Sequence, residues 1–179
     1  MSSFDHRHRF VASGSYQFPF FQGAGGATEA LAGGWRVNAI VTLQSGAPFT
    51  VNLGQDRANI GSGPAQRPDQ IGDPTLPAAQ RSADRWFNTA AFALQDPFTF
   101  GSAGRNSVFA PGLANVDLSI VKGWYVGEQR RVEFRWEIFN LLNRANFDVP
   151  NRVFGTPNFG RILSAQHARE MQLGLRYSF

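Results

Sequence analysis

Apolar and polar residues alternate in five separate segments of this chain, and this period of two limits the fold more than any other feature. The clearest segment is residues 170–179, where apolar residues occupy every second position: Met171, Leu173, Leu175, Tyr177 and Phe179. Successive side chains of a β-strand point to opposite faces of the sheet. The segment therefore has one apolar face and one polar face, and we predict a strand.

Four more segments follow the same pattern. Together with residues 170–179, they predict five strands, near residues 8–18, 35–45, 115–124, 131–142 and 170–179. In the fourth segment, apolar residues alternate with charged ones: Val132, Phe134, Trp136 and Ile138 against Arg131, Glu133, Arg135 and Glu137. A helix would spread both sets around its whole circumference. Each segment has about ten residues, which matches the ~9–11 that a tilted strand needs to cross a bilayer.

Short and long connections alternate along the chain. The short ones are a glycine-rich stretch, residues 19–34, which we predict to be a flexible turn, and a tight turn around Gly127-Glu128. The long ones, residues 52–112 and 143–169, are rich in Pro, Asn and Gly and are expected to lack regular structure. Such long loops are unusual in compact domains. Short turns at one rim and long loops at the other are typical of bacterial outer-membrane barrels.

Aromatic residues support this interpretation. If the short turns share one rim, seven aromatic side chains from strands of opposite direction collect near it: Tyr16, Phe18, Trp35, Trp124, Tyr125, Tyr177 and Phe179. Amphipathic rings are enriched where a membrane meets water. The sequence thus predicts an aromatic belt at the rim with the short turns.

Five strands are too few for a closed transmembrane barrel, since the smallest have ~8. Each unpaired backbone group at an open edge would cost several kcal/mol in lipid. We therefore predict an all-β fold, an antiparallel transmembrane β-barrel segment that forms the carboxyl-terminal part of a larger barrel. The absence of an apolar signal segment in MSSFDHRHRF agrees with a missing amino-terminal part.

Charge and composition exclude several classes of function. The net charge is +4, but the cations are scattered along the chain among 13 carboxylates, whereas nucleic-acid-binding proteins concentrate them on one face. We expect no nucleic-acid partner. The chain has no cysteine, which excludes disulfides, Cys-based zinc sites and thiol nucleophiles.

We expect no enzyme activity, cofactor or metal. Glu133 and Glu137 share a strand face but stand about 13 Å apart at ~3.4 Å per residue, beyond the ~5–9.5 Å of paired-carboxylate glycosidases. Two histidines of the N-terminal segment, His6 and His8, have only His167 as a further imidazole. Instead, polar residues of the last two strands are predicted to line a water-filled lumen: Arg131, Glu133, Arg135, Glu137, Gln172 and Arg176.

The long loops are the better candidates for binding, because loops on a rigid scaffold often carry function. Residues 55–84 contain seven charged candidates: Asp56, Arg57, Arg67, Asp69, Asp73, Arg81 and Asp84. Residues 143–158 add Asn146, Phe147, Asp148 and Asn151. Phe beside Asn and Asp would suit a saccharide or a peptide. An ordinary solvated loop is the alternative for each single residue.

Several stretches resemble the carboxyl-terminal barrel segment of Oar-like TonB-dependent transporters. They are RHRFVASGSYQFPF (7–20), GWRVNAIVTLQSGAPFTV (34–51), RWFNTAAFA (85–93), FGSAGRNSVFAPGLANVDLSIVKGW (100–124) and VEFRWEIFNLLNRANFDVPNRVFGTPNFGRI (132–162). The closing MQLGLRYSF resembles the strand signal that the barrel-assembly machinery reads, with Leu173, Leu175, Tyr177 and Phe179 as its apolar positions.

This resemblance implies an outer-membrane transporter of about 22 strands, with a plug domain, in the outer membrane of a Gram-negative bacterium. It implies three partners: outer-membrane lipid, the barrel-assembly machinery, and the TonB complex through an amino-terminal part that this chain lacks. Two other functions stay open. The first is a passive, porin-like or structural barrel element. The second is a soluble β-sandwich binding module whose apolar faces meet each other.

Overall fold

The computed structural model describes residues 2–21, 23–61, 66–127 and 130–179. The chain divides into two compact units. The sheet unit comprises residues 9–43, 114–145 and 167–179, and the loop unit comprises residues 44–113 and 146–166 with the N-terminal segment up to residue 8. No helix in the described ranges is long and apolar enough to span a membrane.

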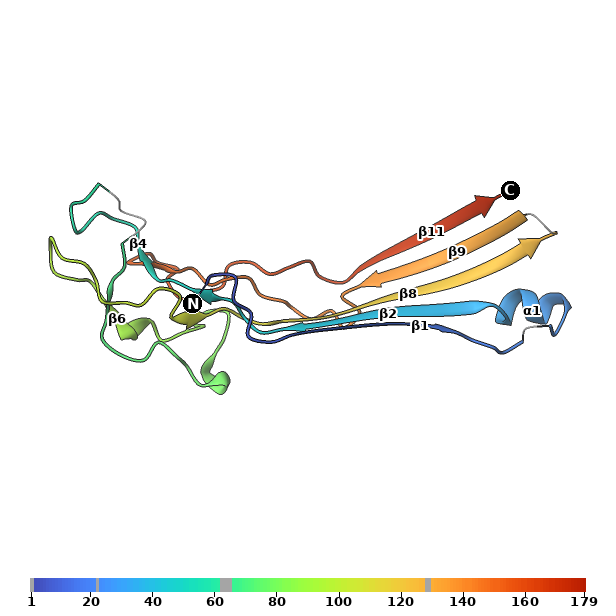
Figure 1. Cartoon of the computed structure of the whole chain (residues 1–179), viewed down its shortest axis with the longest axis horizontal. Helices are drawn as coiled ribbons and strands as arrows, with labels where there is room; N and C mark the ends of the chain where they lie inside the picture. The colour runs from blue at the N-terminus through green and yellow to red at the C-terminus, as the bar shows by residue number, and fades with distance from the viewer. Residues whose placement is uncertain (1, 22, 62–65, 128–129) are drawn as a thin grey trace. The chain divides into compact units, whose positions relative to one another are not determined.

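The sheet unit is a five-stranded antiparallel sheet in the order β1–β2–β8–β9–β11 (Figure 1). Its strands are β1 (Arg9–Gln17), β2 (Trp35–Gln44), β8 (Leu113–Val126), β9 (Arg130–Phe139) and β11 (Glu170–Ser178). All five predicted strands are confirmed. β8 is longer than predicted, and β9 ends at residue 139 rather than 142 because Asn140 adopts a positive φ of 52° that breaks the extended backbone.

The strand register aligns the alternating residues into rows. Leu175 lies opposite Phe134, which in turn lies opposite Lys122. The apolar residues before and after them in each strand are paired in the same way. On the other face, Arg176 lies opposite Glu133. The alternation within each strand thus becomes one apolar face and one polar face of the sheet.

The apolar face of the edge strand β11 is uncovered. Leu173 is 68% exposed and Leu175 is 75% exposed, and every residue of β1, at the other edge, is exposed as well. Within the described residues, no second layer covers these rows, although a β-sandwich would bury them. The exposed apolar rows are what a lipid-facing barrel wall requires.

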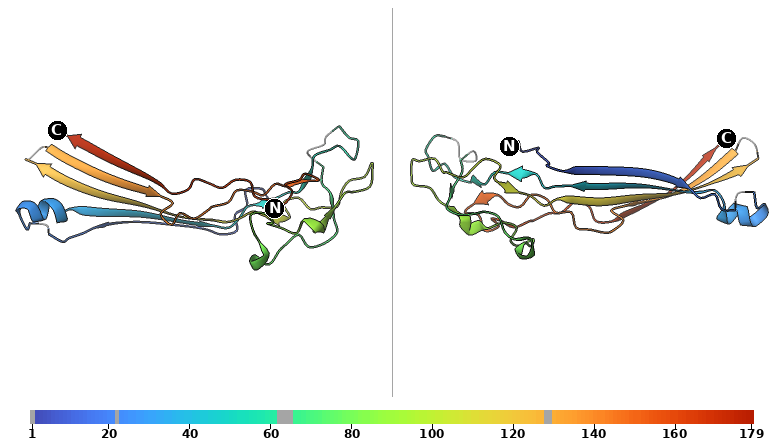
Figure 2. Two further views of the ribbon diagram at one scale, coloured as in Figure 1. Left: turned by 180° about the vertical axis from the view of Figure 1, so that it is seen from behind. Right: turned by 60° about the horizontal axis from the view of Figure 1, so that its bottom comes forward.

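The predicted aromatic residues do gather at one end of the sheet. The carboxyl terminus and α1 (Gly26–Ala32) lie at this end (Figures 1 and 2). Neighbouring rings there touch: Tyr16 and Phe18 at 5.3 Å between centroids, and Tyr177 and Phe179 at 5.9 Å. Part of the tight turn predicted here, Glu128, lies outside the described residues, whereas Gly127 has a positive φ of 76°.

The glycine-rich connection is not the flexible turn that the sequence predicts, because it contains helix α1. Three side chains of the sheet hold this helix. The indole of Trp35 donates to the Leu31 carbonyl at 2.9 Å, and the indole of Trp124 donates to the Ala30 carbonyl. The Lys122 ammonium donates to carbonyls at the end of the helix, which are those of Glu29 and Gly33. The Glu29 carbonyl also accepts from the Gly33 amide at 3.0 Å. The last carbonyls of a helix otherwise lack a partner within the helix, so these donors stabilise α1.

Lys122 interrupts the apolar row of β8, and α1 explains why a cation is tolerated there. Its side chain is buried, with 1% exposed, and its ammonium lies 5.7 Å from the Trp35 ring and 5.5 Å from the Trp124 ring. The two rings and the helix carbonyls replace water around the charge. Lys122, Trp35 and Trp124 thus hold α1 at the end of the sheet where the short connections lie.

Replacing Lys122 with methionine is expected to loosen α1 while the strands stay paired. The variant removes two charge-assisted hydrogen bonds, each worth about 1.5–3 kcal/mol. Hydrogen exchange should show faster exchange at residues 27–33 and unchanged exchange in β8 and β9. Equal exchange of α1 in both proteins would contradict the assigned role of Lys122.

The loop unit corrects the expectation that residues 52–112 and 143–169 lack regular structure. It contains three short strand pairs: β3 (Pro48–Phe49) with β7 (Val108–Phe109), β4 (Asn52–Leu53) with β10 (Val153–Phe154), and β5 (Asp69–Gln70) with β6 (Phe92–Ala93). It also contains two 3-10 helices, η1 (Ala78–Gln80) and η2 (Thr89–Ala91).

A buried aromatic cluster explains why these loops fold. Its buried members are Phe49, Val51, Phe87, Ala91, Phe92, Ala103 and Val108. Phe87 lies at its centre, with ring centroids 5.7 Å from Phe49, 6.0 Å from Phe92 and 5.2 Å from Phe159. The phenylalanines that the sequence scatters through long connections thus form a core of their own.

Candidate functional site

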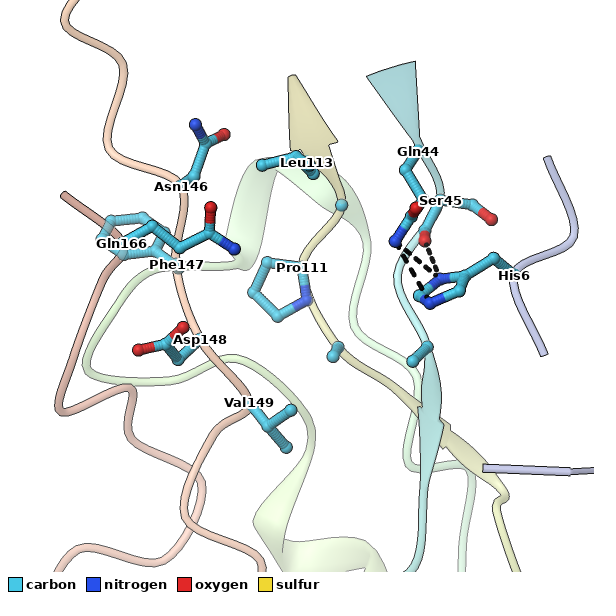
Figure 3. Close-up of a pocket in the computed structure, with 13 residues that line it drawn as sticks. His6, Gln44, Ser45, Pro111, Leu113, Asn146, Phe147, Asp148, Val149 and Gln166 are labelled. Atoms are coloured by element: carbon cyan, nitrogen blue, oxygen red, sulfur yellow. Dashed lines mark hydrogen bonds between the residues drawn. The ribbon is translucent and has the colours of Figure 1, made fainter. Parts of the chain in front are cut away.

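A pocket of about 170 Å³ in the loop unit brings together several of the predicted binding residues (Figure 3). One wall is the segment 146–149, with Asn146, Phe147 and Asp148. Gln44 and His6 stand on the opposite side, and the chain around Pro111 and Leu113 lies between them (Figure 3). We call this the His6 pocket.

The wall with Asn146 is fixed by backbone pairing. The carbonyl of Asn146 accepts a hydrogen bond from the Gln166 amide at 2.8 Å, and the Asp148 amide donates to the Ser164 carbonyl at 3.1 Å. Between them, Phe147 forms a β-bridge with Ala165. This pairing is antiparallel, so the two loop strands hold Phe147 and Asp148 at set positions beside the pocket.

His6 is held by the end of β2. Its Nδ1 lies 2.9 Å from the Ser45 carbonyl oxygen, and the side-chain nitrogen of Gln44 lies 3.1 Å from each ring nitrogen. Close backbone packing sustains the arrangement, because a Cβ on Gly112 would lie 2.6 Å from the carbonyl oxygen of Gln44. The imidazole thereby becomes part of a hydrogen-bonded wall.

The chemistry of the His6 pocket is that of a polar binding site with an aromatic side. It offers amides, an imidazole and one carboxylate, beside the partly exposed ring of Phe147. Amide and carboxylate groups suit hydroxyl and amine groups, and a ring face suits the apolar side of a sugar or a side chain. Asn146, Phe147 and Asp148, three of the candidates in the second long loop, line this pocket.

Most of the charged candidates of residues 55–84 hold the loop unit together. The Arg57 guanidinium donates to the Gln95 carbonyl at 2.7 Å, and the Arg81 guanidinium donates to the Leu76 carbonyl at 2.8 Å. Asp84 forms an ion pair with Arg161 at 2.6 Å. These contacts fix loops that lack a regular ladder, so they support the alternative of ordinary loop residues.

Three aspartates of the same segment accept backbone hydrogen bonds. Asp69 accepts from the Ser102 amide at 2.8 Å. The Ile60 amide, followed by that of Gly61, lowers the pKa of Asp56, and the Thr75 amide lowers the pKa of Asp73. Asn151 acts likewise, since its side chain accepts from the Val153 amide at 2.9 Å. These side chains order turns of the chain.

The predicted lumen residues share the polar face of β9 and β11. Glu133 accepts from Arg131 at 2.8 Å and from Arg135 at 3.0 Å, while Arg135 also lies 3.7 Å from Glu137. Gln172 and Arg176 face Glu137 and Glu133 across the strand pair. Arg135 thus pairs with both glutamates, which agrees with a row of alternating charge rather than a catalytic carboxylate pair.

Two of the three histidines, His6 and His8, contact Ser45. His6 lies in the pocket, and the amide of His8 donates to the Ser45 hydroxyl. His167 contacts Glu170 in the sheet unit, with 2.8 Å between its Nδ1 and a carboxylate oxygen. Within the described ranges, no three His, Asp or Glu side chains are grouped so that they could hold a metal ion.

His167 gives a prediction on pH dependence. Its hydrogen bond to Glu170, and then the charge of that carboxylate, raise the pKa of His167. Because the folded-state pKa is raised, the pair stabilises the fold fully below about pH 6.5, and this contribution is lost as the pH rises through the raised pKa. A Glu170→Gln variant should titrate His167 at lower pH in an NMR titration. An unchanged midpoint would contradict the pairing.

Sequence reasoning missed the residues that complete the His6 pocket. Gln44 is the last residue of β2, Leu113 is the first residue of β8, and Gln166 comes from the returning strand of the second long loop. The signal that points to the first two is their position at the strand ends that lead into the loops. Gln166 has no such signal, because its place depends on the pairing of 146–148 with 164–166.

Comparison with protein families gives one match over nearly the whole chain. The model of a family described as outer membrane beta barrel domain matches residues 1–172. Neither the curated proteins nor the solved structures compared with the chain gave a match.

Proposed function

The chain belongs to the outer-membrane β-barrel domain family, and from this premise we propose that it is a carboxyl-terminal segment of a TonB-dependent transporter. Membership places the protein in the outer membrane of a Gram-negative bacterium. In the proposed transporter, the five strands form part of a barrel of about 22 strands, and the loop unit binds a substrate before import. The substrate is a saccharide or a peptide.

The folded loop unit is the observation that carries this proposal. Its segments connect β2 to β8 and β9 to β11, so the chain enters and leaves it at the strand ends away from the short turns. A buried core and paired strands order these loops around the His6 pocket. Preorganised loops lose less conformational entropy on binding, which favours capture of a dilute substrate.

The polar face of the sheet supports the same function. Four charged residues lie on one face of β9: Arg131, Glu133, Arg135 and Glu137. Partly exposed ion pairs of this kind contribute at most about 1 kcal/mol to stability. Their role in the proposal is to line an aqueous lumen. The proposal therefore gives the chain a binding and lining role and no catalytic one.

Two tests distinguish the proposed transporter from a passive pore, one on the gene and one on the full-length protein. The reading frame upstream of this chain should encode a plug domain and a TonB-binding segment. Vesicles that contain the purified full-length protein should then resist swelling in neutral sugars, because a plug closes the lumen. A frame without a plug, or vesicles that swell as fast as porin vesicles, would favour the passive barrel element and overturn the proposal.

The partners follow from the same proposal. Lipid contacts the apolar face, the TonB complex acts through the amino-terminal part, and the barrel-assembly machinery reads the last strand. Phe179 is 96% exposed, as a side chain available to a receptor must be. We propose Phe179, Tyr177, Leu175 and Leu173 as the residues that the machinery reads.

Deleting Phe179 from the full-length protein is expected to lower the amount of assembled barrel sharply. The deletion removes the terminal aromatic of the proposed signal but no strand pair, because β11 ends at Ser178. Surface labelling of cells would measure the assembled fraction, with Ser178→Ala as the matched control. Normal insertion of the deletion variant would argue against a terminal assembly signal.

A further inference from the structure

A second pocket of the loop unit carries three arginines. It has a volume of about 720 Å³ and is lined by Ser2, Ser3, Thr50, Asn52, Arg67, Arg105, Asn106 and Arg152. None of the described residues that line it is acidic. The other lining groups are hydroxyls and amides, so the pocket offers positive charge together with neutral hydrogen-bonding groups. We call it the arginine pocket.

The segments that carry the arginines are fastened to one another. The Arg67 guanidinium donates to the Ala103 carbonyl at 2.8 Å, and the Arg152 carbonyl accepts from the Asn52 amide at 3.0 Å. Thr50 and Asn106 exchange two hydrogen bonds, of 3.0 and 2.9 Å, which places the neighbouring Arg105. These hydrogen bonds join four segments of the chain, around residues 50–52, 67, 103–106 and 152. The backbone around the pocket and the Arg67 side chain are therefore fixed.

The three positive charges lack a counter-charge in the described part of the protein. None of the three guanidinium groups lies within ion-pair distance of a described carboxylate, although Arg161 and Arg135 elsewhere in the chain form such pairs. Like charges brought to one pocket repel one another, and a bound anion would relieve this repulsion. An arginine side chain also matches the two oxygens of a carboxylate, sulfate or phosphate group.

We propose that the arginine pocket binds a solute that carries an oxyanion on a hydroxyl-rich body, such as an acidic saccharide. Arg67, Arg105 and Arg152 bind the carboxylate, sulfate or phosphate group. Thr50, Asn52 and Asn106 face the hydroxyl groups. That this solute is the imported substrate rests on the proposed function, whereas its binding to the pocket does not.

Calorimetry on the full-length protein in detergent tests the proposal. The probes are a galacturonate trimer, inorganic sulfate and inorganic phosphate, with maltotriose as the neutral analogue. The trimer should bind saturably and more weakly as salt is added, and maltotriose should not bind. Replacing both exposed arginines, Arg105→Gln with Arg152→Gln, should weaken binding of the trimer by at least about tenfold. Arg85→Gln, the same charge change outside the pocket, should leave the affinity within about twofold.

Three outcomes would overturn the proposal. It fails if none of the anions binds, or if the double variant binds the trimer as tightly as the unchanged protein while both melt at the same temperature. It also fails if the arginines are required only for retention of lipopolysaccharide phosphates and no soluble anion binds. If the anion binds but the upstream frame encodes no plug, the binding proposal for the arginine pocket stands and the proposed transporter function fails. If the frame encodes a plug but no anion binds, the proposed transporter function stands and the binding proposal fails.

Discussion

A Phe87→Ala variant is expected to lose about 3–5 kcal/mol of the stability of the loop unit, because it removes the central ring of a closely packed aromatic cluster. Phe87 is 2% exposed and contacts the rings of Phe49, Phe92 and Phe159. Alanine would leave a cavity that these rings cannot fill without leaving their own contacts. The paired strands of the sheet unit do not depend on this side chain.

Limited proteolysis and hydrogen exchange measure this effect separately in the two units. In the Phe87→Ala variant, residues 48–53 and 86–93 should exchange faster, whereas β8 and β9 should keep their protection. Phe100→Ala is the matched control, since Phe100 is 73% exposed and its removal should change little. Equal protection of the loop unit in both variants would show that the cluster does not hold it together.

A charge on the apolar face of β11 has the second large effect expected here. Leu175 lies near the middle of the strand, opposite Phe134, and is 75% exposed. If this face contacts lipid, Leu175→Arg places a guanidinium near the bilayer midplane, at a cost of about 2–4 kcal/mol. The same arginine on the polar face, as Gln172→Arg opposite Glu137, should cost much less.

Reversible unfolding in lipid vesicles by denaturant would give both differences in the free energy of unfolding. The contrast between the two variants matters more than either value, because both add the same side chain to one strand. A cost of similar size for Gln172→Arg and Leu175→Arg would mean that the two faces do not meet different solvents.

The strands could be predicted from the sequence because their signal is local. Alternation within residues 131–138 or 170–179 needs no knowledge of distant residues, and it also gives the faces and the charged row correctly. Helix α1 could not be predicted, since it depends on donors that are remote in sequence. The cation of Lys122 interrupts an apolar row, and its position is explained only by the structure, in which it contacts the carbonyls of Glu29 and Gly33.

The loop unit shows the same limit. Its Pro and Gly content predicts turns, but the contacts of Phe87 with Phe49 and Phe159 join positions far apart in the chain. Residues 146–148 could be proposed for binding from their composition. Their arrangement with Gln44 and His6 in one pocket could not, because it depends on how both long loops return to the sheet.

The claim on which this account depends is that the apolar rows of the sheet contact lipid and the polar rows contact water. Because the chain has no cysteine, single cysteines at positions 171–178 of the full-length protein can carry a spin label. In the membrane, collision with oxygen should be high at positions 171, 173, 175 and 177, and collision with a water-soluble nickel chelate should be high at the positions between them. Equal accessibility to the chelate on both faces, or burial of the odd-numbered positions from both reagents, would contradict the account.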